Sequence, residues 1–139
     1  LNIIVSSGFR DYNTQKSILD TNIASGNKNA TKLIAKPGHS EHQLGVAIDF
    51  TSPSIGNVSA TGKFGDTLES KWLEENASKY GFVLSYPKGK EDITGYLYEP
   101  WHYRYVGIEH AIEIVNSGKT INEYFKEIKE SDINKKSAL

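Results

Sequence analysis

The chain has 139 residues, with 16 Lys plus Arg against 17 Asp plus Glu, four His, no Cys and no Met. Without Cys there is no disulfide, no thiolate nucleophile and no Cys-ligated metal, so a metal site has to be built from His, Asp or Glu. A net charge of −1 also argues against a nucleic-acid binder, which would show clustered Lys and Arg.

The size of the chain predicts one globular domain over residues 1–139, with a polar tail from about residue 130. The apolar runs are too short to cross a bilayer, so we expect no membrane contact by this segment. We expect a monomer. The chain begins at Leu1 and not at Met, which we interpret as an excised fragment.

The first elements along the chain are a strand and a helix. Asn2–Ser6 is apolar and β-branched and runs into Ser7-Gly8, which is typical of a strand entering a turn. Asp11–Ala24 predicts a helix that ends near Gly26. The apolar face of this helix is expected to carry Ile18, Leu19 and Ile23.

A loop is expected over Ser25–Gln43, and Val46–Phe50 then alternates with a period of two, which predicts a strand. Its core face should carry Val46, Ile48 and Phe50, while Ala47 and Asp49 share the opposite face. The remaining expected elements are a loop over Ser52–Gly65, a helix capped by Asp66 and ended by Gly81, a strand at Phe82–Leu84, a turn at Pro87–Lys90, an extended piece at Tyr96–Tyr98, a strand at Trp101–Val106, a helix at Ile108–Asn116, and a last helix capped by Thr120.

Two segments concentrate the His and carboxylate side chains, Gly38–Asp49 and Glu99–Arg104. Gly45 permits a tight turn before the second strand, which would bring His42 back over the face that carries Asp49. His102 is the natural third ligand. A His2Asp set leaves one tetrahedral position open, as a catalytic Zn²⁺ requires, so we expect one zinc ion per chain.

Glu99 precedes His102 by three residues and is separated from it by Pro100, which keeps the preceding residue extended. A carboxylate beside a zinc-activated water can take its proton and pass it to a leaving amine. We assign no site role to His39, His110 or Glu41, and we interpret Glu41 as an exposed loop charge.

Two motifs, Ser40-x-His42-x-x-Gly45-x-Ala47-x-Asp49 and Glu99-x-Trp101-His102, resemble the zinc carboxypeptidases of the VanY and LdcB (DacB) type, which trim peptidoglycan stem peptides. Ser7–Arg10 and Tyr86–Lys90 are also similar to segments of that family. The resemblance makes Arg10 the cation that stabilises the developing oxyanion. The other implied positions are the zinc ligands His42, Asp49 and His102, the base Glu99, the holders of the D-alanine carboxylate Gln15 and Ser40, and the groove walls Tyr86 and Trp101.

The resemblance implies an α+β fold of the Hedgehog/DD-peptidase-like type, a small mostly antiparallel sheet with packed helices. It implies a single zinc peptidase domain that removes the terminal D-alanine from peptidoglycan stem tetrapeptides, an L,D-carboxypeptidase. Such an enzyme would work on the extracellular face of a bacterial cell, secreted or anchored through a segment outside this chain.

Three alternatives were weighed against this function. A D,D-carboxypeptidase acting on D-Ala-D-Ala pentapeptide ends stays open, as does a non-catalytic peptidoglycan-binding module, although the intact Glu99 disfavours the latter. A serine peptidase is disfavoured because both S-x-x-K matches, at Ser25 and Ser85, contain residues that break a helix, and neither has an S-D-N or K-T-G partner.

Overall fold

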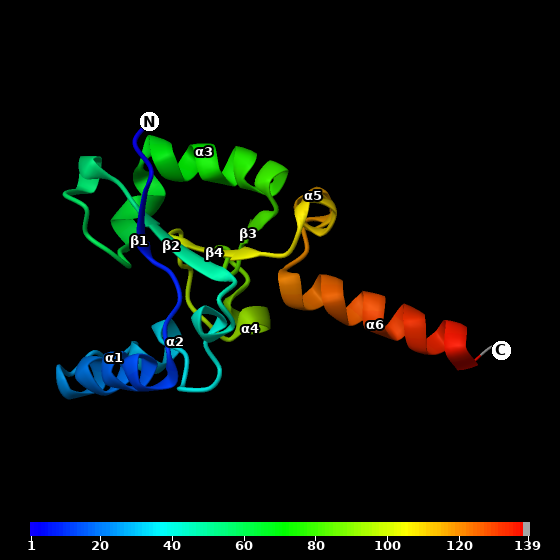
Figure 1. The fold of residues 1–139 in the computed structure, drawn as a ribbon, viewed down its shortest axis with the longest axis horizontal. Coiled ribbons are helices and arrows are strands. Elements are labelled where there is room, and N and C mark those ends of the chain that lie inside the picture. The colour runs from blue at the N-terminus through cyan, green and yellow to red at the C-terminus, as the bar shows by residue number, and fades with distance from the viewer. Residues whose placement is uncertain (138–139) are drawn as a thin grey trace.

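The structure, a computed structural model, describes residues 1–137, with side chains described as far as Asn134 (Figure 1). Four strands form one sheet in the order β1-β2-β4-β3, and every neighbouring pair is antiparallel. The strands are β1 (Ile4–Ser7), β2 (Ala47–Thr51), β3 (Phe82–Leu84) and β4 (His102–Tyr105). The expected α+β class with a small antiparallel sheet is therefore confirmed.

Helices pack around the sheet, with α3 on one side and α1 and α2 on the other, while α6 runs outward beyond β3 (Figure 1). The α-helices are α1 (Tyr12–Ala24), α2 (Ala30–Leu33), α3 (Leu68–Asn76), α4 (Glu91–Thr94), α5 (Ile108–Ser117) and α6 (Ile121–Ser137). The 3₁₀ helices are η1 (Glu41–Leu44), η2 (Pro53–Ile55), η3 (Gly62–Asp66) and η4 (Ala77–Tyr80). Within residues 1–137, no helix combines the length and the apolar character that a membrane span needs.

Two apolar clusters support the sheet. The first packs α3 and η3 against β4 and consists of Phe64, Leu73, Ala77, Trp101 and Tyr103. The second joins β3 to the C-terminal helices and consists of Val83, Ala111, Ile114, Ile121 and Tyr124. The first cluster covers the face of β2 and β4 that carries Phe50 and Tyr103, and the opposite face of these two strands carries Asp49, His102 and Arg104.

The face of β2 that carries Phe50 packs against the first core cluster, as expected, but the opposite face is the more deeply buried one. Asp49, 3% exposed, and its neighbours Ala47 and Thr51 are the buried residues of this strand, while Ile48 and Phe50 are only half-buried. The face that carries Ala47 and Asp49 is covered because η1 and the segment after β1 fold over it: β2 contacts η1, and both Arg10 and His42 reach Asp49.

Several local expectations also need correction. Ile23 is exposed, because the buried positions of α1 are Gln15 and Leu19. Thr67, rather than Asp66, caps α3 through its side-chain oxygen. The last strand is shorter than expected, since β4 begins at His102 and ends at Tyr105. Short helices replace the expected loop at α2, η1, η2 and η3, and α4 lies where no element was expected.

The C-terminal helix is longer than expected. Thr120 and Glu123 form a reciprocal capping box, in which each backbone N–H donates to the other residue's side chain. The polar run after Glu130 is helical as far as Ser137, since Lys and Glu are good helix formers, and residues 138–139 of the expected tail lie outside the described residues.

A glycine at the start of β3 is required by both its conformation and its neighbours. Gly81 has φ +85°, and an added Cβ would lie 3.1 Å from the carbonyl carbon of Gly107 and 2.6 Å from the Tyr105 ring. We expect Gly81→Ala to lower the free energy of unfolding by about 3 kcal/mol or more in urea titrations. Gly26→Ala is the matched control, since Gly26 has φ +79° with nothing near its Cβ position. It should cost only about 1–2 kcal/mol, and equal losses would contradict the close-contact argument.

Candidate active site

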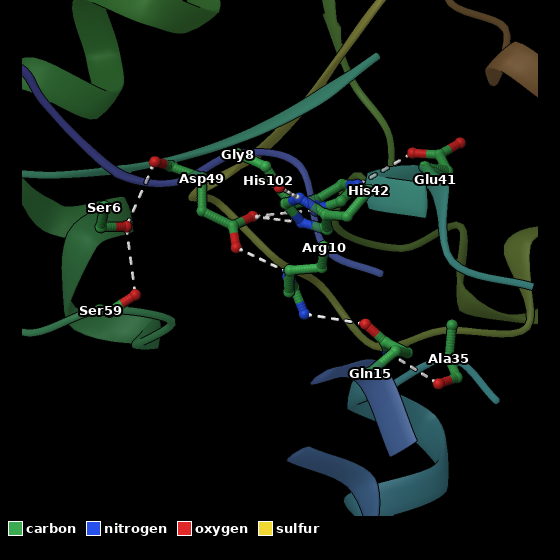
Figure 2. A network of polar contacts seen from close by, with 10 residues as sticks. All are labelled: Ser6, Gly8, Arg10, Gln15, Ala35, Glu41, His42, Asp49, Ser59 and His102. Carbon is green, nitrogen blue, oxygen red and sulfur yellow. Dashed lines mark hydrogen bonds and ion pairs between the residues drawn. The ribbon is translucent and has the colours of Figure 1, made fainter. Parts of the chain in front are cut away.

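Sheet register brings the two halves of the site together. Asp49 of β2 lies directly opposite His102 of β4, and His42 lies on η1, which ends at Gly45 with φ +71° and leads into β2. The side chains of His42, Asp49 and His102 are all buried, and one ligand atom from each lies within 4.8 Å of the others (Figure 2). The expected turn at Gly45 is confirmed.

Each histidine has one ring nitrogen close to Asp49, and its other ring nitrogen lies against an acceptor outside the ligand set. His42 Nδ1 lies 2.6 Å from the carbonyl oxygen of Gly8, while its Nε2 makes no hydrogen bond and lies 3.2 Å from Asp49 Oδ1. His102 Nδ1 lies 2.9 Å from the same Oδ1. Two nitrogens and one carboxylate oxygen suit Zn²⁺, and the unpartnered His42 Nε2 is the kind of buried atom that an ion would satisfy. These residues therefore fit a zinc ion.

The charges of this group are strongly coupled. Burial opposes ionisation of Asp49, but its hydrogen bond to His102 and the closeness of the His42 ring hold its pKa well below the usual range. Burial likewise opposes protonation of His102, yet its bonds to Asp49 and Glu41 raise its pKa to about 9. A zinc ion would thus compete with a proton on His102, because an imidazole ligand binds in its deprotonated form.

Glu99 lies in the same hollow without a partner. It is 4% exposed, and its Oε1 makes no hydrogen bond. Burial, together with the charges of Asp49 and Glu41, raises its pKa to about 8, although His102 and Arg10 act in the opposite direction. Its backbone is fixed by bonds to Tyr86 and His102, so the carboxyl group is placed firmly while its oxygen stays free.

All nine residues singled out in the sequence line one hollow of about 160 Å³. Arg10 donates to Asp49 Oδ2 at 3.1 Å and to Gln15 Oε1 at 3.0 Å, and Gln15 in turn donates to the carbonyl of Ala35 (Figure 2). Tyr86 stacks on His102 with ring centroids 5.0 Å apart. The set comprises Arg10, Gln15, Ser40, His42, Asp49, Tyr86, Glu99, Trp101 and His102. Their individual roles stay predictions.

Two residues of the site were missed. Tyr96 lines the hollow and packs on Tyr86, with ring centroids 4.8 Å apart. The interpretation of Glu41 as an exposed loop charge is wrong, because its side chain is 16% exposed and binds His102 and Arg104. His110 lies outside the site and pairs with Tyr124. No local pattern could reveal the partners of Glu41, since they lie more than forty residues away in sequence.

The raised pKa of Glu99 predicts a pH-dependent stability for the metal-free protein. The carboxyl group of Glu99 has a pKa of about 8 in the folded state and the ordinary 4.5 in the unfolded state. Between these two pH values the folded chain still binds a proton that the unfolded chain has released, so the free energy of unfolding falls as the pH rises. We expect Glu99→Gln to be more stable than the parent chain, by a margin roughly 2–4 kcal/mol larger at pH 8 than at pH 5. Urea unfolding after chelation measures this margin, and a margin independent of pH would contradict the burial of an unpaired carboxyl group.

Comparison with known proteins identifies the family. The VanY family profile, described as D-alanyl-D-alanine carboxypeptidase, matches residues 1–108. YodJ of Bacillus subtilis is 48% identical over 124 residues, which cover 88% of this chain and 45% of YodJ, so the chain spans less than half the length of that relative.

Solved structures show the same relationship. An LdcB LD-carboxypeptidase superposes with a TM-score of 0.80 at 46% identity, covering 90% of this chain and 58% of LdcB. A vancomycin-resistance D,D-pentapeptidase VanY in complex with Zn(II) superposes with a TM-score of 0.75 at 38% identity, covering 88% of this chain and 71% of that chain. The chain belongs to the VanY family.

Proposed function

We propose that this domain is a zinc-dependent L,D-carboxypeptidase, which removes the terminal D-alanine from peptidoglycan stem tetrapeptides outside the cell membrane. The observation that carries the proposal is the unpartnered Oε1 of Glu99, buried in the same hollow as the His42, Asp49 and His102 set. A buried carboxyl group without a partner is costly to keep, and a proton-transfer role explains why it is there.

Zinc held by this set would supply Lewis acidity, which polarises a carbonyl group and makes water a stronger acid. Glu99 Oε1 would accept the proton of the attacking water and return it to the leaving amine of D-alanine. A nearby divalent cation favours the ionised carboxylate, so the base form of Glu99 is accessible in the loaded protein.

Arg10 is suited to stabilise negative charge on the scissile carbonyl oxygen. Its two terminal nitrogens already bond Gln15 and Asp49, which fix the orientation of the guanidinium, and its buried Nε has no partner. A preorganised donor costs no reorganisation when charge develops on the substrate. Gln15 and Ser40, both buried in the hollow, would hold the terminal carboxylate, and Tyr86 and Trp101 would flank the peptide, although Trp101 also packs in the first core cluster.

The L,D specificity is supported by likeness. The segments Tyr86–Lys90 and Tyr98–Arg104 resemble LdcB more than VanY, and the LD-carboxypeptidase superposes at the higher identity of the two structures compared. A D,D-carboxypeptidase is the second candidate, because the family description and the D,D-pentapeptidase point to D-Ala-D-Ala ends.

The base assignment predicts a separation of metal binding from catalysis. Glu99→Gln should keep about one zinc per chain by elemental analysis while D-alanine release falls about 10²–10⁴-fold, since the amide cannot accept the proton. Glu109→Gln, at an exposed position on α5, is the control and should keep full activity. An active Glu99→Gln protein would mean that another group is the base. A wild-type chain that binds stem peptide but yields no product at any zinc concentration would indicate a binding module.

Specificity is tested directly by mass spectrometry of muropeptides. The zinc-loaded chain should convert tetrapeptide to tripeptide and leave pentapeptide intact. Conversion of pentapeptide to tetrapeptide, with the tetrapeptide left uncut, would establish the D,D alternative instead.

A further inference from the structure

Behind the metal site, on the side of His102 that faces away from Asp49, lies the carboxylate of Glu41. Its Oε2 is 2.9 Å from His102 Nε2, and both side chains are largely buried. The ring of His102 is therefore held at both nitrogens by carboxylates, with Asp49 at Nδ1 and Glu41 at Nε2.

The position of Glu41 is itself fixed by two further donors. Ser85 Oγ donates to Oε2 at 2.7 Å, and Arg104 donates to Oε1 at 2.9 Å. Both oxygens thus accept hydrogen bonds, one of them from the guanidinium of Arg104, which forms an ion pair with Glu41.

Asp49 and Glu41 both act as acceptors, so a protonated His102 donates from both of its nitrogens. Nδ1 is the nitrogen that faces the point where the ligand atoms converge, and once zinc replaces the proton on Nδ1, the remaining proton belongs on Nε2, where Glu41 accepts it. His42 shows the same arrangement with the nitrogens exchanged, because the Gly8 carbonyl occupies its Nδ1 and leaves Nε2 for the metal. With zinc bound, each imidazole would therefore be held in one tautomer by an acceptor outside the metal site.

We propose that Glu41 is a positioning residue, which holds His102 in the Nε2-protonated tautomer and at the correct ring orientation for Nδ1 to bind zinc. The carboxylate also increases the basicity of the ligand nitrogen, as outer carboxylates do for metal-bound histidines. This inference rests on His102 being a zinc ligand, as the proposed function requires. Among the residues that the structure describes, Glu41 belongs neither to the set of candidate zinc ligands nor to the lining of the hollow.

Glu41→Gln tests the role with minimal change of shape. Because both carboxylate oxygens accept bonds, the amide group of Gln would face a donor in either orientation, so one bond to His102, Ser85 or Arg104 is always lost. We expect zinc affinity, measured by competition with a chromogenic chelator, to fall about 10–100-fold. Glu109→Gln is again the matched control and should bind zinc as the parent chain does.

The affinity measurement separates positioning from a merely structural role. A structural role would lower the free energy of unfolding of the metal-free protein in urea while leaving the zinc affinity of the folded protein unchanged. If folded Glu41→Gln binds zinc as tightly as the parent chain, the inference is wrong. If the parent chain itself binds no zinc, it is the proposed function that fails.

A second measurement needs no variant. In the zinc-loaded parent chain, ¹⁵N NMR of the histidine side chains should show His102 with its proton on Nε2 and the metal on Nδ1, and His42 with the opposite assignment. Zinc on His102 Nε2 would overturn the inference even if Glu41→Gln failed to fold.

Discussion

The pairing of β2 with β4 is the constraint on which the rest of the site depends. It places Asp49 opposite His102, residues that are far apart in sequence, and a shift of one residue would turn one of them to the opposite face. The register is secured on the other face by the core, where the rings of Phe50 and Tyr103 pack edge to face with centroids 5.7 Å apart. Apolar packing on one side of the sheet thus determines polar geometry on the other.

Burial of several charges beneath this sheet face is tolerable because they compensate one another. Arg10 and Asp49 form an ion pair at 3.1 Å, and Asp49 is shared by two histidines. Leaving one of these charges unpaired in so buried a place would cost several kcal/mol. A bound zinc ion would add positive charge where three ligand atoms already converge, so the arrangement of charges favours the cation that the chemistry needs.

The sequence predicts which residues come together in the hollow better than it predicts the details of the fold, and there is a physical reason. Metal ligands must be His or carboxylate in a chain without Cys, and the two short segments contain three of the four His together with Asp49 and Glu99. Which strands pair, and in which register, depends on tertiary packing, and the hydrophobic periodicity of a single segment carries no information about it. Alternation alone could not show that the Asp49 face is the more buried one, because the segments that cover it come from β1 and η1. Glu41 was misinterpreted for the same reason: its environment is made by Ser85, His102 and Arg104, all distant in sequence.

Glu41 and Glu99 are the same residue type, but their surroundings suit them to two different roles. Both are largely buried near His102, so burial opposes ionisation of each. Glu41 meets three donors that outweigh burial and hold its pKa at about 2, whereas Glu99 has an oxygen with no donor, and its pKa rises to about 8. A permanently charged carboxylate can hold a ligand in place but cannot exchange protons near neutral pH, and a carboxyl group with a raised pKa can. Glu99 is therefore free to transfer protons because it lacks the donors that surround Glu41. The cost is a lower stability of the folded chain, since the carboxyl group of Glu99 is buried without a partner.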